Sequence, residues 1–296
     1  MYYIKLLRPK DWAKNLFLFI PLFFAGKVFD FETIYLVFGG FLAFSFLASS
    51  IYIINDYKDI EDDRKHPEKR HRPLAAGTVN KSVALIISAG LVLAGGILGY
   101  YIDLSGKFLF ILGIYFSLNL SYSLGLKNLS IVDILIVSAG FVLRVKGGSI
   151  LAEVDPTEWL IIMTFLLALF MSIAKRRDDV LLKIATGTEM RKSMKGYSLE
   201  FLNTLLALFC AILIVSYINY TVSDATFAKF GHRLYYTSLF VIAGIMRYLQ
   251  ITFIHNKAGS PTEILYKDRF IQIVLLLWIA SFFIVLYLRD ITFFEK

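Results

Sequence analysis

The sequence has a single cysteine and few charged residues. That cysteine, Cys210, lies inside an apolar run, so the chain has no second thiol for a disulfide, a cysteine-rich metal site or a redox pair. Charged residues make up 18% of the 296 positions and hydrophobic residues make up 57%. An average soluble domain has about 25% charged and roughly 45–50% apolar residues. These proportions argue against a soluble domain and favour a chain embedded in lipid.

Three further features are missing from the sequence. No cleavage pattern of small residues follows the basic lead-in of residues 1–12, so we expect no cleavable signal. The apolar runs are continuous rather than alternating, which argues against a β-barrel. No low-complexity linker or polar domain interrupts the chain. We therefore expect residues 1–296 to form one integral membrane domain.

Nine apolar runs dominate the chain. A membrane-spanning helix needs about 20 predominantly apolar residues, and each run reaches or approaches that length. The runs cover residues 14–29, 33–54, 83–102, 108–124, 131–150, 159–174, 201–220, 235–254 and 270–288. The predicted fold is all-α, a polytopic membrane bundle of about nine transmembrane helices. Within the fifth run, Gly147-Gly148 indicates close helix packing.

The charges are distributed unevenly between the loops. The chain has 31 basic and 23 acidic residues, a formal net charge of +8. Basic residues gather in alternate loops, chiefly 58–81 and 175–195, and the positive-inside rule places these loops in the cytoplasm. We therefore predict a cell (inner) membrane protein with a cytoplasmic N-terminus. Because the basic residues lie in short loops between apolar runs, lipid head groups and phosphorylated substrates are better partners than nucleic acid.

The clearest candidate site lies where the second run meets the cytoplasm. The run leads into Asn55, Asp56, Asp59 and Asp63, which fall within roughly a quarter-turn of one helix face at about 100° per residue. Carboxylates this close repel one another and are costly near hydrocarbon without a cation. Mg²⁺ takes oxygen ligands and joins carboxylates to substrate phosphates. We assign Asp56, Asp59 and Asp63 as metal ligands with Asn55 assisting; a solvated acidic helix end would explain the acidity but not the spacing.

A basic segment follows the acidic one directly. It contains Lys69, Arg70 and Arg72, and arginine is well shaped for bidentate contacts with phosphate. Taken alone, the segment is explained equally well as a topology anchor. Beside the carboxylates, a phosphate-binding role is favoured.

The spacing Asn55-Asp56-x-x-Asp59-x-x-x-Asp63 resembles the first acidic motif of the UbiA superfamily of intramembrane prenyltransferases. The resemblance implies a helical bundle around a central cavity, cytoplasmic cap loops, and Mg²⁺ with a diphosphate at this motif. It is closest to one branch, the polyprenyl-phosphate (decaprenyl-phosphate) phosphoribosyltransferases. The similar segments are LRPKDWAKN (7–15), HPEKRHRPLAAG (66–77), YSLGLK (122–127), VD (132–133), GFVLR (140–144), AKRRDD (174–179), PTE (261–263) and DR (268–269).

The second motif separates the branches of this superfamily. Prenyl-transferring members resemble one another in a second aspartate-rich motif, but the corresponding place here reads KRRDD at 175–179. The basic-first order is similar to that of the phosphoribosyl branch, in which Asp179 would take the acidic position. Lys175 and Arg176 would then bind a phosphate. A phosphoribosyl diphosphate donor carries a 5-phosphate beside its diphosphate, which gives a chemical reason for the basic pair.

Five further residues are candidates for substrate binding. Lys14 and Asn15 begin the first run, where membrane anchoring and phosphate contact explain them equally well. Arg144 lies inside an apolar run, where ionisable residues are functional or paired, although it could also extend to the outer interface. The family resemblance adds Tyr122 and Lys127.

These residues and the resemblance together predict one reaction. It is the Mg²⁺-dependent transfer of 5-phosphoribose from phosphoribosyl diphosphate to a polyprenyl (decaprenyl-like) phosphate, releasing diphosphate, in lipid-linked sugar synthesis for the cell envelope. A UbiA-type prenyltransferase acting on an aromatic acceptor would share the metal site but would need a second aspartate motif. A membrane transporter is a further alternative, but the charges gather in cytoplasmic loops rather than at the bilayer midplane.

Overall fold

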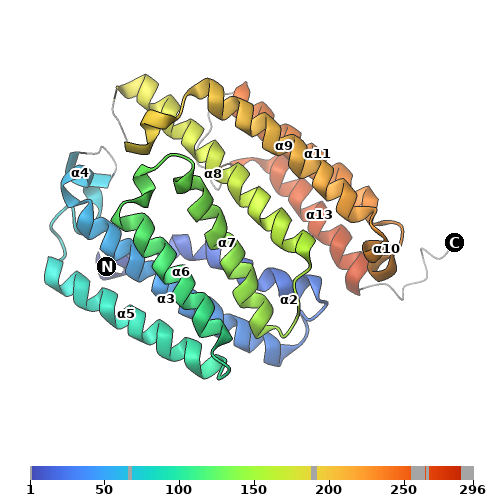
Figure 1. Cartoon of the computed structure of the whole chain (residues 1–296), viewed down its shortest axis with the longest axis horizontal. Coiled ribbons are helices and arrows are strands. Elements are labelled where there is room, and N and C mark those ends of the chain that lie inside the picture. The colour runs from blue at the N-terminus through green and yellow to red at the C-terminus, as the bar shows by residue number, and fades with distance from the viewer. Residues whose placement is uncertain (1, 66–68, 188–191, 255–263, 265–266, 288–296) are drawn as a thin grey trace. The chain divides into compact units, whose positions relative to one another are not determined.

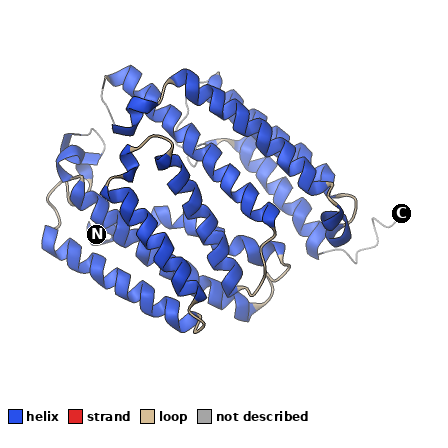
Figure 2. Ribbon diagram, viewed as in Figure 1, coloured by secondary structure: helices blue, strands red, loops and turns tan. Residues whose placement is uncertain are grey.

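A computed structural model describes residues 2–65, 69–187, 192–254, 264 and 267–287. Within these ranges the chain forms helices and no strand (Figure 2). Its contacts divide it into two compact units, Met1–Thr157 and Glu158–Lys296, which are described one at a time. The predicted all-α fold is confirmed.

The first unit begins with three short helices and continues with four long ones joined by shorter pieces (Figure 1). Its elements are α1 (Tyr2–Leu7), η1 (Pro9–Phe19), α2 (Ile20–Phe24), α3 (Phe31–Lys58), α4 (Ile60–Lys65), η2 (Lys69–His71), α5 (Lys81–Ile102), α6 (Lys107–Leu124), η3 (Leu126–Asn128) and α7 (Val132–Leu151).

Helix α3 is the centre of this first unit. The side chain of Asp30 caps its N-terminus by accepting a hydrogen bond from the Thr33 backbone N–H at 3.3 Å. Helices α5, α6 and α7 and the 3-10 helix η1 all pack against α3. The shared core includes Leu18, Phe44 and Phe108, which are fully buried. The acidic residues at the far end of α3 are therefore attached to the best-packed helix of the unit.

The 3-10 helix η1 runs antiparallel to α3. Trp12 Nε1 donates to Ser49 Oγ at 3.0 Å, and Asn15 Nδ2 donates to Ser45 Oγ at 2.9 Å. Residue numbers increase along η1 while those of its hydrogen-bond partners on α3 decrease. The segment η1 therefore runs along α3 from the acidic end of α3 toward its N-terminus.

A glycine on α7 permits η1 to approach closely. A Cβ atom added at Gly148 would lie 1.9 Å from the carbonyl oxygen of Leu18, a distance that no side chain could tolerate. The backbone of η1 therefore lies directly against α7, as the small-residue pair in the sequence indicated. This contact places Asn15 beside the middle of α7.

The described part of the second unit consists of four long helices with three short pieces between them. Its elements are α8 (Glu158–Thr186), η4 (Lys192–Gly196), α9 (Leu199–Thr221), α10 (Asp224–Phe230), η5 (Leu234–Thr237), α11 (Ser238–Phe253) and α13 (Arg269–Tyr287). Helix α9 packs against α8 and α11, and α11 packs against α13. Arg247 Nη2 lies 2.8 Å from Asp268 Oδ2, and this hydrogen bond lowers the pKa of the Asp268 carboxyl group.

Eight helices in the described ranges are long and apolar enough to span a membrane, against nine predicted runs. The difference is the first run, 14–29, which forms η1 and α2 instead of one long α-helix. Pro21 lies at the start of α2 and has no backbone N–H to donate. A 3-10 helix rises about 2.0 Å per residue instead of 1.5 Å. The short segment therefore still runs along α3 between Arg8 at the acidic end and Asp30 at the other.

Candidate active site

The acidic segment, residues 55–63, lies at the C-terminal end of α3. Helix α3 ends at Lys58, Asp59 occupies the junction with φ −96° and ψ 12°, and α4 begins at Ile60. A helix C-terminus carries partial negative charge, so carboxylates there are unfavourable unless cations lie beside them. The structure supplies those cations from three other parts of the first unit.

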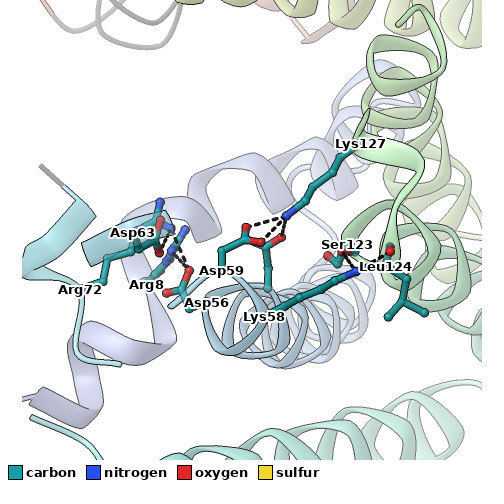
Figure 3. Close-up of polar contacts among 10 residues, drawn as sticks. Arg8, Asp56, Lys58, Asp59, Asp63, Arg72, Ser123, Leu124 and Lys127 are labelled. Carbon is teal, nitrogen blue, oxygen red and sulfur yellow. Dashed lines mark hydrogen bonds and ion pairs between the residues drawn. The ribbon is translucent and has the colours of Figure 1, made fainter. Parts of the chain in front are cut away.

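Asp56 and Asp63 form one buried set with two arginines. Their side chains are 2% and 5% exposed. Arg72 Nη1 bridges them, at 3.0 Å from Asp56 Oδ1 and 2.7 Å from Asp63 Oδ2, and Arg8 Nη2 contacts the same Asp56 oxygen (Figure 3). Two negative and two positive charges thus balance within this set.

Asn55 and Asp59 form a second set around Lys127. The Lys127 ammonium lies 2.8 Å and 2.6 Å from the two carboxylate oxygens of Asp59 and 3.1 Å from Asn55 Oδ1. Asn55 Nδ2 also donates to Asp59 at 3.1 Å. The adjacent Lys58 extends elsewhere, to the backbone carbonyls of Ser123 and Leu124 (Figure 3). Lys127 is therefore the basic side chain that reaches Asp59.

The structure thus divides the four predicted residues into two sets instead of one convergent face. The break between α3 and α4 separates Asp59 from the Asp56–Asp63 pair. Oxygen is the donor type that Mg²⁺ prefers, so the chemistry of the segment suits this ion. In the described arrangement these side chains bind the protein's own cations, and within the described residues no three acidic, histidine or cysteine side chains lie close enough together to form a metal site.

A second polar centre lies inside the first unit, around Arg144 of α7. Arg144 is 5% exposed. Its guanidinium donates to Asn15 Oδ1 at 2.7 Å, to the Gly140 carbonyl at 2.8 Å and to the Tyr115 hydroxyl at 2.9 Å. It also lies over the ring of Tyr115, 4.8 Å from the centroid. The hydrogen-bond acceptors of this buried cation are all uncharged, so its positive charge is not neutralised by a carboxylate among them.

The remaining predicted residues of the first unit lie around these two centres. Lys14 pairs with Asp11 at 2.7 Å. Arg70 is exposed on η2 and its Nε donates to His71 at 3.3 Å. Lys69 begins η2, and Tyr122 is half-buried on α6. Of the similar segments, residues 66–68 and 261–263 lie outside the described ranges.

The second predicted motif belongs to the second unit. The sequence placed residues 175–179 in a loop, but α8 continues through them. Lys175 is exposed, whereas Arg176 is 3% exposed and pairs with Asp179 one turn further on. Arg177 donates to Asn203 at 2.7 Å. Because α8 continues through this motif, Arg176 and Asp179 lie one helical turn apart and form an i,i+3 ion pair.

Two residues of these centres were missed by the sequence reasoning. Arg8 has left-handed backbone angles, φ 52° and ψ 58°, an uncommon conformation for a non-glycine residue. The sequence feature that could have identified Arg8 is its position in the LRPKDWAKN segment, immediately before a proline. Tyr115 carried no signal, because a tyrosine inside an apolar run is typical of membrane helices.

A model of the UbiA prenyltransferase family matches residues 16–273. The chain belongs to this family. It is a multi-pass membrane transferase of the UbiA superfamily, as the apolar helices and the family match together indicate. The transporter alternative is therefore not retained.

Two curated relatives of this UbiA-family chain are bacterial enzymes named decaprenyl-phosphate phosphoribosyltransferase. The Corynebacterium glutamicum enzyme is 31% identical over 289 residues, which cover 96% of this chain and 86% of the relative. The Mycolicibacterium smegmatis enzyme is 33% identical over 289 residues, which cover 94% and 90%. The branch that the sequence motifs resembled is thus matched over nearly the whole chain.

A solved structure supports the UbiA fold. The UbiA homolog from Archaeoglobus fulgidus bound to DMAPP and Mg²⁺ superposes with a TM-score of 0.70 at 20% identity, covering 97% of this chain and 99% of that one. At this identity the likeness concerns the fold alone. It confirms the predicted helical membrane architecture.

Proposed function

We propose that this UbiA-family transferase moves 5-phosphoribose from phosphoribosyl diphosphate to a long-chain polyprenyl phosphate and releases diphosphate. The observation that carries the proposal is the mixed set of carboxylates and basic side chains at the end of α3. It is supported by relatives about 30% identical whose names describe this transfer. The product would be a lipid-linked sugar phosphate of the kind used in building a cell envelope.

The basic side chains at the acidic segment suit the diphosphate of the donor. Arg8, Arg72 and Lys127 supply N–H groups from three separate segments of the first unit. Charge-assisted hydrogen bonds to phosphate are about twice as strong as neutral ones. These three cations would stabilise the negative charge that grows on the diphosphate as it departs. The predicted Lys69 and Arg70 lie on the neighbouring element η2.

The chemistry itself requires little acid–base help from the protein. The bond between ribose C1 and the diphosphate oxygen breaks, and the diphosphate leaves with the electron pair. A new bond forms between C1 and an oxygen of the lipid phosphate. That nucleophile is already an anion, so no general base has to remove a proton from it.

Arg144 supports binding of a second anionic group. A buried guanidinium whose hydrogen-bond acceptors are uncharged retains its attraction for an anion, which is stronger away from water. Asn15 and Tyr115 hold the guanidinium in place. Lys14 is next to Asn15 in η1, and we assign this centre to a phosphate of the donor or of the lipid acceptor.

We include Mg²⁺ in the proposal because the donor atoms suit it and because related UbiA structures were solved with it. When bound to a diphosphate, Mg²⁺ neutralises part of the charge of the leaving group. Of the four predicted residues, Asp59 and Asn55 would hold it, because Asp56 and Asp63 are bound by Arg8 and Arg72. In the described arrangement these residues bind the protein's own cations.

Membrane orientation completes the proposal. The acidic segment and the stretch 175–195 would both face the cytoplasm, with four candidate spans between them. The N-terminus would lie on the same side, because Arg8 contacts Asp56. Single cysteines introduced into residues 58–81 or 175–195 of a Cys210→Ser protein should react with an impermeant thiol reagent in inverted vesicles. They should not react in intact cells.

A reconstitution assay tests the proposed reaction. Purified protein in lipid nanodiscs is given labelled phosphoribosyl diphosphate, decaprenyl phosphate and Mg²⁺, and the lipid product is analysed by mass spectrometry. We expect one phosphoribosyl group on the lipid for each diphosphate released. A UbiA-type prenyl transfer to an aromatic acceptor is the second candidate, since related structures contain prenyl diphosphates. Prenylation without phosphoribosyl transfer would favour it.

A further inference from the structure

Three carboxylates of the acidic segment are matched by an equal number of basic side chains. Three carboxylates, Asp56, Asp59 and Asp63, meet three basic side chains from elsewhere in the first unit, Arg8, Arg72 and Lys127. A divalent cation arriving alone would thus meet a neutralised cluster and would be repelled by three cations within a few ångströms. Either a basic side chain must leave, or an anion must arrive with the metal.

The Lys127 ammonium occupies a position that suits a metal ion. It is surrounded by three oxygen atoms, the two of Asp59 at 2.8 Å and 2.6 Å and Oδ1 of Asn55 at 3.1 Å. Oxygen donors from a carboxylate and an amide are typical ligands of hard divalent cations. Magnesium binds such oxygens at about 2.0–2.1 Å, so the metal and the ammonium cannot occupy the position together.

We propose that Lys127 is an exchangeable counter-cation of Asp59 and Asn55, and that a divalent cation binds these oxygens after a phosphate group of the donor draws Lys127 away. The inference rests on the proposed function, since it takes the donor to be a phosphorylated sugar. Metal and donor then favour each other's binding. By linkage, the factor by which the donor raises metal affinity equals the factor by which metal raises donor affinity.

Exposure indicates why the exchange takes place at Lys127 and not at the arginines. The Asp56 and Asp63 side chains are almost fully buried, and Arg72 bridges both of them. Removing that bridge would leave the buried Asp63 carboxylate without its arginine partner, which is strongly unfavourable. The Asp59 and Lys127 side chains are 24% and 16% exposed, so water and ligand can reach this pair. Lys127 also lies in a short turn, η3, and not inside a long helix.

Lys58 provides a matched control. It lies at the same helix end, one residue before Asp59, and carries the same charge. Its ammonium is bonded to the carbonyls of Ser123 and Leu124 instead of to a carboxylate. A change at Lys58 therefore alters the local electrostatic potential without vacating the oxygens around Lys127.

Binding of Mn²⁺ without donor or acceptor tests the exchange. Full-length protein in phosphatidylcholine nanodiscs is titrated with Mn²⁺, and free Mn²⁺ is followed by electron paramagnetic resonance. Loss of a charge-assisted hydrogen bond corresponds to a factor of roughly ten to a hundred, so Lys127→Met should bind Mn²⁺ at least about tenfold more tightly than wild type. Lys58→Met should stay within about twofold of wild type, and adding Asp59→Asn to Lys127→Met should remove the gain. Lys127→Gln repeats the test with a polar side chain should the Met variant be poorly folded.

A second arm measures donor binding without metal. Labelled phosphoribosyl diphosphate is bound in the presence of EDTA, where Lys127→Met should lose about tenfold in affinity and Lys58→Met should not. Equal Mn²⁺ affinity in wild type, Lys127→Met and Lys127→Gln would overturn the exchange, as would donor binding that is unaffected by Lys127→Met. Should no variant bind phosphoribosyl diphosphate while Lys127→Met still gains Mn²⁺ affinity, the counter-cation role stands and the proposed donor is wrong.

Discussion

The ammonium nitrogen of Lys127 lies 2.6 Å from a carboxylate oxygen of Asp59, although 68 residues separate the two in the sequence. This contact ties the turn between α6 and α7 to the end of α3. The acidic segment is therefore one part of an assembly to which Arg8, Arg72 and Lys127 contribute positive charge from outside the segment. Its properties depend on those partners as much as on its own spacing.

Asp59→Asn should abolish transfer while leaving the protein folded. The Asp59 side chain is 24% exposed, so its loss leaves no deeply buried charge unpaired. Its neighbour Asp62 is exposed, and Asp62→Asn is the matched control that should retain near-normal activity. The measurement is initial transfer rate at saturating Mg²⁺, with thermal unfolding as a check of folding. Similar rates in both variants would count against the assignment of Asp59.

Arg72→Ala should reduce both donor binding and stability. Breaking a buried ion pair costs about 3–5 kcal/mol; we expect a smaller loss in the free energy of unfolding, because Arg72 is 25% exposed and Arg8 still contacts Asp56. Lys81→Ala is the control, since Lys81 is an exposed basic residue of the same 58–81 segment and is assigned no part in binding. Thermal unfolding and donor binding by equilibrium dialysis measure the two effects. An unchanged melting temperature in Arg72→Ala would mean that the bridge is not stabilising.

Arg144→Lys should lose most of the activity although it keeps the charge. The guanidinium makes three hydrogen bonds in different directions, and an ammonium cannot reproduce the planar fork. Asn15→Ala should act in the same direction but more weakly, because it removes one of these bonds. Transfer rates measured over a range of each substrate identify which phosphate the centre serves. If Arg144→Lys retained the wild-type KM for both substrates and the wild-type rate, the centre would be purely structural.

Arg176→Ala should weaken donor binding by roughly tenfold to a hundredfold, the equivalent of one charge-assisted hydrogen bond. Arg176→Lys should recover only part of the loss. The loss should be larger for ribose 5-phosphate than for inorganic diphosphate as competitors, because we propose that Lys175 and Arg176 bind the 5-phosphate. An equal loss for both competitors would place Arg176 at the diphosphate or in the fold.

Gly148→Ala should destabilise the first unit. The added Cβ would meet the Leu18 carbonyl at 1.9 Å, and overpacking of this kind costs about 1–3 kcal/mol. It would also push η1 away from α7 and weaken the Asn15–Arg144 bond. Gly113→Ala is the control, because a Cβ there meets nothing within 4 Å. Equal melting temperatures for the two variants would contradict the close approach of η1 to α7.

Much of this fold could be predicted from the sequence because apolar run length is a strong signal. Eight of the nine predicted runs are long helices, and the acidic segment lies at the end of the second one, as expected. The prediction of a single α-helix for the first run was wrong, because the 3-10 conformation of η1 depends on packing against α3 and α7. The predicted end of the sixth run at residue 174 was also wrong, since a helix can continue into a charged sequence once its apolar part is anchored.

The contacts within the candidate site could not be predicted in the same way. Helical spacing placed Asn55, Asp56, Asp59 and Asp63 on one face, but the break at Asp59 divides them. The pairing of Lys127 with Asp59 depends on how α6 and α7 pack against α3. The role of Arg8 depends on the antiparallel path of η1. Such long-range contacts leave no periodic pattern in the sequence.

The central claim, that the donor is a phosphoribosyl diphosphate, is tested most directly by competition between donors. Purified protein in nanodiscs is given equal concentrations of phosphoribosyl diphosphate and geranyl diphosphate, together with decaprenyl phosphate and an aromatic acceptor. We predict that phosphoribosyl decaprenyl phosphate is the main product and that Asp59→Asn fails to form it. A prenylated aromatic product with no phosphoribosyl lipid would contradict the claim.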